Sequence, residues 1–273
     1  MRNICGKKND KKKRHIGTAL LPLCVLTLLS SCGTWGAGKS KSLLDETPAP
    51  EETQVTEETR TKEELWDAAV EDAVFSENDE IEALVSLTKE DDRVIWDESG
   101  ERVLVVTWND YEEDCSKGNS ISTEHGEIWV TSLGEMEQWF QENSSGVEDW
   151  KLRFSQLLGV PGDGDYSQFT AFWIRPEYMI RPAYVTDVTA EMVNDYSAVT
   201  DPQYKQWFDQ NIINSYFAGE YPWTRLGYTY DWSGGSTDYG LTEFLIFDGS
   251  KAEIEFTRST EEFVEWLREQ DEK

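Results

Sequence analysis

The chain has 273 residues, of which 25 are Lys or Arg and 54 are Asp or Glu, giving a formal net charge of −29 at pH 7. A surface this negative repels phosphate backbones and anionic headgroups, so the composition excludes nucleic acid and direct lipid-headgroup binding as expected activities. Eleven of the twelve tryptophans lie beyond residue 60, and that part of the chain is long enough for one sizeable core.

The first 31 residues are ordered like a bacterial secretory signal. A basic head, residues 7–14, precedes an apolar run, residues 16–29, which is shorter than the ~20 residues of a spanning helix. The run ends in Leu29-Ser30-Ser31-Cys32, which resembles the lipobox of bacterial lipoproteins. In that family the cysteine is lipidated and becomes the first residue of the mature protein. An ordinary secretory signal cut nearby, or a short uncleaved membrane segment, remains the alternative.

The lipobox resemblance implies that residues 1–31 are removed, that Cys32 is the lipidation site, and that acyl chains hold the protein on the outer side of a membrane. Gly33 follows the cysteine in place of Asp, so in a two-membrane bacterium the resemblance implies the outer membrane rather than the cell membrane. Removal takes seven basic residues and one acidic residue with it, leaving a net charge of −35. Cys115 is then the one free thiol, and an intramolecular disulfide is excluded.

Residues 32–60 are predicted to form a disordered acidic tether. They contain few apolar residues, two prolines and repeats of the Glu-Glu-Thr kind, so they cannot bury enough surface to offset the entropy of ordering. Residues 61–273 are predicted to form a single globular domain.

Within that domain, helical and strand patterns alternate along the chain. Thr61 to Glu64 form a capping box ahead of a helix, and Thr200 or Asp201 can cap another that starts at Pro202. Further helices are expected over residues 147–158 and after Ser132 and Ser259. Strands are expected over residues 93–96 and 102–108, as a hairpin, and over residues 127–131, 169–174, 224–232, 241–247 and 252–257, with a turn at residues 248–250 joining the last two.

Two strand-to-helix junctions match in detail. Ser132 is followed by Glu135 and Trp139, and Ser259 is followed at the same offsets by Glu262 and Trp266. Serine with glutamate three residues later is a capping box, and each tryptophan lies on the face that packs against a sheet. The pattern indicates either an internal duplication of a β-hairpin followed by a helix or two ordinary capped helices. The predicted class is α+β, with a mainly antiparallel sheet and helices packed on one face.

The sequence offers little for catalysis or metal binding. His125 is the one histidine of the mature chain, and there is no G-x-S-x-G elbow, no zinc ligand set and no nucleotide-binding loop. No metal or other cofactor is predicted, and the turn at residues 162–165 is only a weak approach to a calcium loop. Paired carboxylates for glycoside hydrolysis stay open, because a chain with so many acids provides such pairs by accident.

Three arginines in aromatic, weakly charged stretches are the candidate ligand-binding residues. Arg175, Arg181 and Arg225 carry the chemistry that fixes carboxylates or phosphates, and neighbouring Tyr and Trp rings stack on sugars or other rings. In an extended strand over residues 224–232, Arg225 and Asp231 would share one face and Tyr228 and Tyr230 the other, and the face with Arg225 and Asp231 is the expected functional one. Alternatively, each arginine pairs with one of the many acids and each ring fills the core. The predicted site set is Arg175, Arg181, Arg225, Tyr228, Tyr230, Asp231 and Trp232.

Residues 221–232, with residues 103–108 and 127–131, resemble a family of uncharacterised bacterial exported proteins, over a span from about Leu84 to the C-terminus. The resemblance implies no activity and no catalytic residues. The expected function is that of a membrane-anchored extracytoplasmic lipoprotein with a binding or structural role towards an envelope ligand or a protein partner. An envelope hydrolase with paired carboxylates is the alternative, and a passive surface coat is the third reading.

Overall fold

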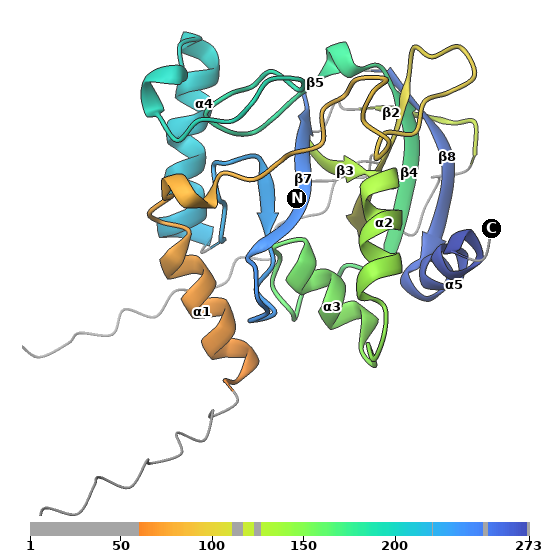
Figure 1. Cartoon of the computed structure of the whole chain (residues 1–273), viewed down its shortest axis with the longest axis horizontal. Helices are drawn as coiled ribbons and strands as arrows, with labels where there is room; N and C mark the ends of the chain where they lie inside the picture. Colours follow the sequence, from red (N-terminus) through yellow and green to blue (C-terminus); the bar gives the residue numbers. More distant parts are fainter. Residues whose placement is uncertain (1–59, 111–116, 123–126, 220, 248–250, 272–273) are drawn as a thin grey trace, which may run out of the picture. The chain divides into compact units, whose positions relative to one another are not determined.

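The computed structural model describes residues 60–110, 117–122, 127–219, 221–247 and 251–271 (Figure 1). The predicted signal peptide and tether, with Cys32, lie outside the described residues, as do Cys115 and His125. Among the residues described, no helix combines the length and the apolar character needed to cross a membrane.

A curled antiparallel sheet forms the centre of the fold, and the predicted α+β class is confirmed. Its strands run in the order β2-β8-β4-β1-β3-β7-β5, and β6 pairs with β7 beside this path. The strands are β1 (Val103–Asn109), β2 (Ser120–Ser122), β3 (Ile128–Ser132), β4 (Gln168–Ile174), β5 (Met179–Ile180), β6 (Tyr228–Tyr230), β7 (Tyr239–Ile246) and β8 (Lys251–Ser259).

Alternation along β1 shows how the two faces of the sheet are covered. Val103 and Val105 point to one core, which is completed by the irregular segment that carries Val85 and Leu87. Leu104 and Val106 point to the other core, against α2 (Leu133–Asn143), α3 (Trp150–Leu157) and α5 (Thr260–Asp271). These three helices lie on one face, as the sequence predicts, whereas an irregular chain covers the opposite face (Figure 1).

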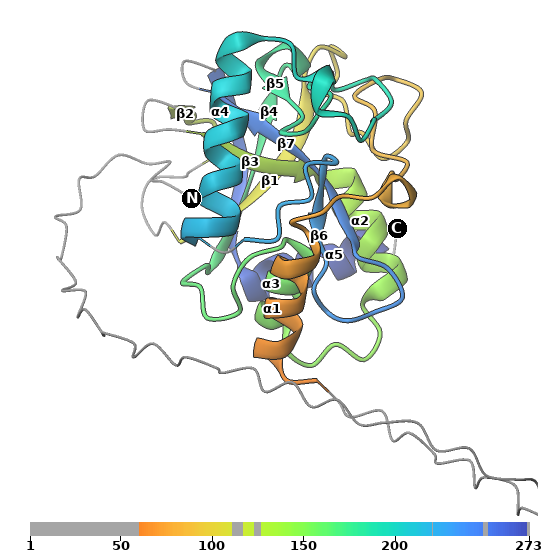
Figure 2. The same cartoon turned by 90° about the vertical axis from the view of Figure 1, so that its left-hand side faces the viewer.

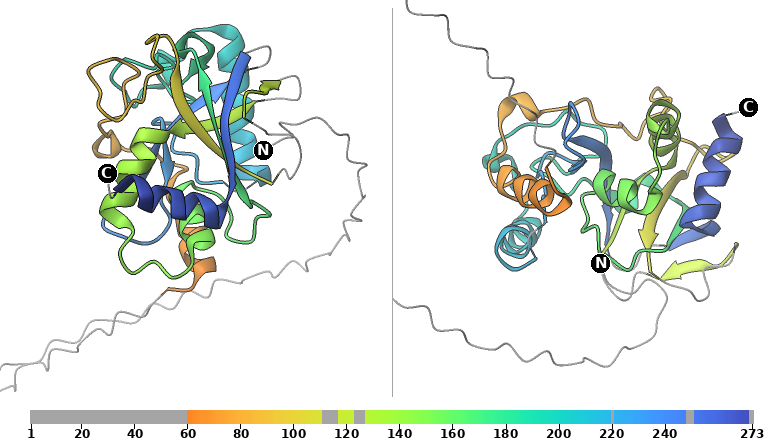
Figure 3. Two further views of the ribbon diagram at one scale, coloured as in Figure 1. Left: turned by 90° about the vertical axis from the view of Figure 1, so that its right-hand side faces the viewer. Right: turned by 90° about the horizontal axis from the view of Figure 1, so that it is seen from below.

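Two more helices lie on the side of the molecule away from α5. They are α1 (Lys62–Asp72) and α4 (Pro202–Ile213), and α4 continues into a π-helix, η4 (Asn214–Gly219). Figure 2 shows α4 beside the sheet, and the right panel of Figure 3 shows α1 in orange and α4 in cyan together, opposite the dark blue α5. Short 3₁₀ turns occur at η1 (Asn78–Glu80), η2 (Pro176–Tyr178) and η3 (Tyr196–Ala198).

Three of the predicted helix starts are confirmed and one has a different role. The capping boxes of Thr61 with Glu64 and of Ser259 with Glu262 form reciprocally, and Asp201 caps α4. The predicted capping box at Ser132 is wrong. Its hydroxyl donates to the carbonyl of Arg93 (2.6 Å), and the Glu135 carboxylate turns into the interior instead of back to the helix start.

The predicted hairpin of residues 241–247 with 252–257 is also wrong. The two strands form as β7 and β8, but β3, β1 and β4 lie between them in the sheet. The earlier hairpin closes through a single bridge between Trp96 and Val103. In the first proposed copy β1 pairs with β3, whereas in the second copy β7 and β8 are not neighbours in the sheet. The internal duplication is therefore not confirmed.

The predicted strand over residues 224–232 is reduced to Tyr228–Tyr230. Arg225 adopts φ +60° and Gly227 φ +88°, and a left-handed residue cannot continue an extended strand. The expected division of this stretch into an arginine face and a tyrosine face therefore fails for Arg225, whose backbone folds back before β6 begins.

Candidate functional site

The three predicted arginines do not converge on one surface. Arg175 is exposed and its guanidinium contacts the carboxylate of Glu101. Arg181 is 1 % exposed and its two terminal nitrogens donate to main-chain carbonyls, so its charge ties together two irregular segments. The accepting residues are Val85 (2.8 Å), Asp187 (3.0 Å), Val188 (3.1 Å) and Ala190. Burial lowers the pKa of Arg181.

Arg225 holds the end of α1 in place. Its guanidinium donates to the carbonyls of Ala73 (3.1 Å) and Val74 (2.8 Å), where the negative end of the helix dipole lies. The rings of Tyr184 and Tyr216 lie 5.9 Å and 5.2 Å from its central carbon. The left-handed backbone of Arg225 thus directs its side chain towards the C-terminal end of α1, where it has a structural role.

The other predicted site residues are held by the chain itself. The Tyr228 hydroxyl donates to the carbonyl of Glu80 (3.1 Å), and the Tyr230 hydroxyl donates to the carboxylate of Asp72 (2.9 Å). Asp231 accepts a two-pronged contact from Arg153 (3.1 and 2.6 Å). The Trp232 indole donates to two main-chain carbonyls. Of the whole predicted set, Tyr228 and Tyr230 alone line the larger cavity described next.

A cavity of about 620 Å³ lies between the sheet and η4. It is bounded by β1, β3, β6 and β7, by the turn after α3, and by Asn214, Ser215 and Ala218 of η4. Its walls are rich in aromatic side chains, among them Trp108, Trp129, Tyr166, Trp223, Tyr228 and Tyr230. We call this the aromatic cavity; its volume and lining are typical of a small-molecule site.

An acidic rim adjoins the aromatic cavity. A second hollow of about 230 Å³ shares Trp108 and Trp129 with it. Four exposed acids line this hollow, and we call them the acidic rim: Asp110, Glu127, Asp163 and Asp165. The turn at residues 162–165, a weak calcium candidate in the sequence, thus supplies two of the four. No described group of three or more His, Cys, Asp or Glu side chains is placed to hold a metal ion.

Glu243 is the unusual residue of the aromatic cavity. It lies on β7, opposite Thr131 of β3, and its side chain is 6 % exposed. Within the described structure neither Glu243 Oε1 nor Thr131 Oγ1 has a hydrogen-bond partner, and both residues line the cavity. The nearby Trp223 N–H donates to the carbonyl of Pro182 (3.0 Å). Burial raises the pKa of Glu243 well above its usual value, because the ionised form would lose its hydration, and this outweighs a hydrogen bond from Trp223 that lowers the pKa.

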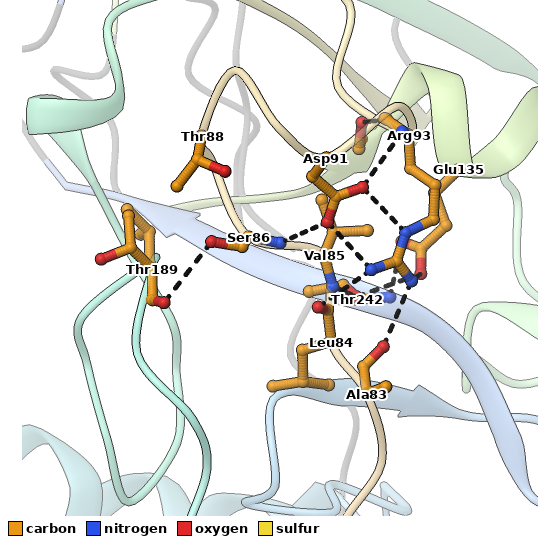
Figure 4. Close-up of polar contacts among 12 residues, drawn as sticks. Ala83, Leu84, Val85, Ser86, Thr88, Asp91, Arg93, Glu135, Thr189 and Thr242 are labelled. Atoms are coloured by element: carbon orange, nitrogen blue, oxygen red, sulfur yellow. Dashed lines mark hydrogen bonds and ion pairs between the residues drawn. The ribbon is translucent and has the colours of Figure 1, made fainter.

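Glu135 is a second buried acid, and in contrast to Glu243 its carboxylate oxygens have hydrogen-bond partners. Glu135 of α2 accepts from the Tyr239 hydroxyl (2.5 Å) and from the main chain (2.8 Å) and hydroxyl (3.0 Å) of Thr242. Figure 4 shows Arg93 between Asp91 and Glu135, with Thr242 beside them. The Arg93 guanidinium lies 3.9 Å from Glu135 and 2.9 Å from Asp91. Burial raises the pKa of Glu135 against these contacts. Glu135 is therefore a structural acid.

Sequence reasoning missed Glu243, although a signal was present. Leu241, Glu243 and Leu245 share one face of β7, so Glu243 is a lone acid in an apolar row. Every residue of β7 after Tyr239 is buried, which leaves no solvated face for a carboxylate. An acid in such a strand needs an internal partner or a ligand.

Comparison with family models, with curated protein sequences and with solved structures finds no significant match for the chain.

Proposed function

We propose that the protein is a membrane-anchored extracytoplasmic lipoprotein whose folded part binds a small envelope ligand in the aromatic cavity. The lipobox-like Leu29-Ser30-Ser31-Cys32 and the acidic tether support the location. One observation carries the binding role: a cavity of about 620 Å³ is bordered by a buried carboxyl, Glu243, with an oxygen left without a partner among the described residues. Leaving such a group unmet costs about 1–3 kcal/mol, and a bound ligand removes that cost.

The placement of the acids favours binding over hydrolysis by paired carboxylates. Besides Glu243, the aromatic cavity is lined by one further carboxylate, Glu127, which is exposed and accepts from the Trp207 indole (2.7 Å). Glu127 lies four residues before Thr131, the partner of Glu243, so the two main-chain positions are roughly 13 Å apart along the strands. Glycosidase carboxyls lie about 5–9.5 Å apart, and Glu127 is directed to Trp207.

The π-helix η4 gives the cavity a wall of unusual geometry. α4 changes from α-helical to π-helical turns at Asn214, and residues Asn214, Ser215 and Ala218 of the wider turns border the cavity. π-helical turns are rare and are frequently found at functional sites. The position of η4 therefore supports a ligand-binding role for the cavity.

A thermal-shift screen of the full-length protein, purified in detergent, against amines, envelope glycans, muropeptides and small carboxylates tests this proposal. A ligand at ~100 times its dissociation constant should stabilise the folded state by about 2.7 kcal/mol. Ala218→Trp, which adds a bulky ring at an exposed residue of the cavity wall, should abolish the shift. Phe217→Trp, at an exposed neighbour outside the lining, is the control. A ligand that binds equally well to the Ala218→Trp variant contradicts the site.

A further inference from the structure

Resting on the proposed function, we propose a chemical class for the ligand: an organic cation whose ammonium group binds the Glu243 carboxylate while the aromatic walls enclose its carbon skeleton. Three features of the described residues carry this inference. They are the charge of the lining, the aromatic character of the walls, and the unmet hydrogen-bonding capacity at the β3–β7 pair.

The charge around the site has a single sign. None of the described residues that line the aromatic cavity or the adjoining hollow is Lys, Arg or His. An anionic ligand would meet Glu243 and the acidic rim with no counter-charge, at a low effective dielectric where repulsion is strong. A cation is attracted by the rim and by the net charge of −29, and both raise its local concentration at the entrance.

The aromatic walls suit the same ligand. The indoles of Trp129 and Trp223 and the phenol ring of Tyr228 line the cavity near the β3–β7 pair. Ring faces attract ammonium groups, most strongly where water is excluded. The chain makes this contact elsewhere at its surface, with Lys89 3.5 Å from the centre of the Trp96 ring and Lys205 3.4 Å from that of Tyr196.

The two orphan oxygens match the donors of an ammonium group. Glu243 Oε1 and Thr131 Oγ1 belong to cross-strand partners, whose side chains lie next to each other on one face of the sheet. A primary ammonium has three N–H donors, so one group can meet a carboxylate and a neighbouring hydroxyl together. A neutral hydroxyl ligand has one donor and brings no charge to the carboxylate.

Binding of a cation also explains how a buried acid can ionise. In the empty cavity burial favours the protonated carboxyl; when the ammonium enters, the proton leaves to solvent and the carboxylate pairs with the cation. The other titratable side chains that border the cavity are Glu127 and four phenols, and, besides burial, the charge of Glu243 contributes to raising the pKa of Tyr204 on α4 and of Tyr216 on η4. Burial raises the pKa of the lining phenols Tyr228 and Tyr230, so these two stay uncharged at pH 8, where the experiment is made. The four lining phenols are Tyr166, Tyr221, Tyr228 and Tyr230.

The experiment compares ammonium probes with neutral probes of matched shape. The full-length protein is titrated calorimetrically at pH 8 with cadaverine and 1,5-pentanediol, and with glucosamine and glucose. We expect one of the ammonium probes to bind about tenfold or more tightly than its neutral counterpart, because hydrogen bonds to a charged partner are the stronger ones. Glu243→Gln, of nearly the same shape, should reduce this preference to less than about threefold.

Glu265→Gln, at an exposed position of α5 outside both linings, should leave the preference unchanged. Near-ultraviolet circular dichroism confirms that each variant is folded. Equal affinity for a neutral probe, an undiminished preference in Glu243→Gln, or no binding of either ammonium probe at millimolar concentration overturns the inference. A neutral ligand that Ala218→Trp excludes would leave the proposed function standing while the cation fails.

Discussion

At the residue scale, the buried charged groups differ in whether the chain itself satisfies them. The terminal nitrogens of Arg181 donate to four main-chain carbonyls, although its Nε has no partner in the described part of the chain, and Glu135 accepts from Tyr239 and Thr242. Glu243 is buried to a similar degree, yet one of its oxygens has no hydrogen-bond partner in the described part of the chain. A buried carboxylate oxygen without a partner costs stability, and a ligand that binds it would remove that cost.

Replacing Glu243 should therefore stabilise the empty protein. We expect Glu243→Gln to raise the free energy of unfolding by about 1–3 kcal/mol at pH 7, because an ionisable group is removed from a buried site. Burial raises the folded-state pKa, so the contribution of Glu243 to stability is full below its usual value of 4.5 and is lost as pH rises through the folded-state pKa. In denaturant titrations the gain of the variant should thus grow from pH 4.5 upward. A gain that shrinks over this range would contradict the burial of an unmet acid.

Arg181 and Arg175, two of the three arginines predicted from the sequence, allow a buried and an exposed arginine to be compared by the same substitution. Arg181→Met should lower the free energy of unfolding by about 3 kcal/mol or more, because several buried carbonyls lose their donor. Arg175→Met should cost less than about 1 kcal/mol, since its contact with Glu101 is exposed and screened by solvent. Denaturant unfolding of both variants measures the difference, and equal losses would refute the structural role of Arg181.

At the scale of elements, one sequence pattern serves two roles. Ser259 and Glu262 cap α5 as the pattern predicts, whereas the corresponding Glu135 of α2 is used in the interior. Glu262→Ala should cost about 1 kcal/mol, the usual value for a lost cap contact. Glu135→Ala should cost about 2–4 kcal/mol, because it leaves buried donors unmet and opens a space. Chemical denaturation of the two variants tests this, and similar losses would count against the interior role of Glu135.

Helices and strands could be predicted from local signals, but strand neighbours could not. Capping residues gave α1, α4 and α5, since a cap depends on a few adjacent residues. The turn at residues 248–250 suggests that β7 and β8 pair, yet β7 pairs with β3, β5 and β6, and β8 pairs with β2 and β4. Apart from β6, these neighbours are distant in sequence, so local turn chemistry did not reveal them.

Only part of the candidate site could be predicted from the sequence, because contacts between residues far apart in the chain are not visible in local patterns. Tyr228 and Tyr230 belong to the predicted site set, and both line the aromatic cavity. The arginines were assigned to the site because they lie in aromatic, weakly charged stretches and can bind carboxylates or phosphates, but main-chain carbonyls far along the chain accept from Arg181 and Arg225. Glu243 could not be predicted as a site residue, because a single acid in a strand is unusual only when both faces of that strand are buried, and the sequence alone does not show that β7 is buried in this way.

At the scale of the whole molecule, we propose that an acidic folded part is attached to a membrane by a lipid anchor at Cys32. Because the net charge of −29 opposes attachment to anionic headgroups, acyl chains would have to hold the protein at the membrane. We expect Cys32→Ser to move the protein from the membrane fraction to the soluble extracytoplasmic fraction, and Cys115→Ser to leave it in place. Fractionation followed by immunoblotting makes the comparison; a Cys32→Ser protein that stays with the membrane would contradict lipid anchoring.

The central claim is that Glu243 and the aromatic walls bind the ammonium group of a small ligand. A crystal structure of the protein with the tightest-binding amine tests it most directly. We expect the ammonium nitrogen to lie about 2.7–3.2 Å from a carboxylate oxygen of Glu243, with the carbon skeleton against the rings of the cavity. An amine bound only at the outer surface, or one whose carbon end faces Glu243, would contradict it.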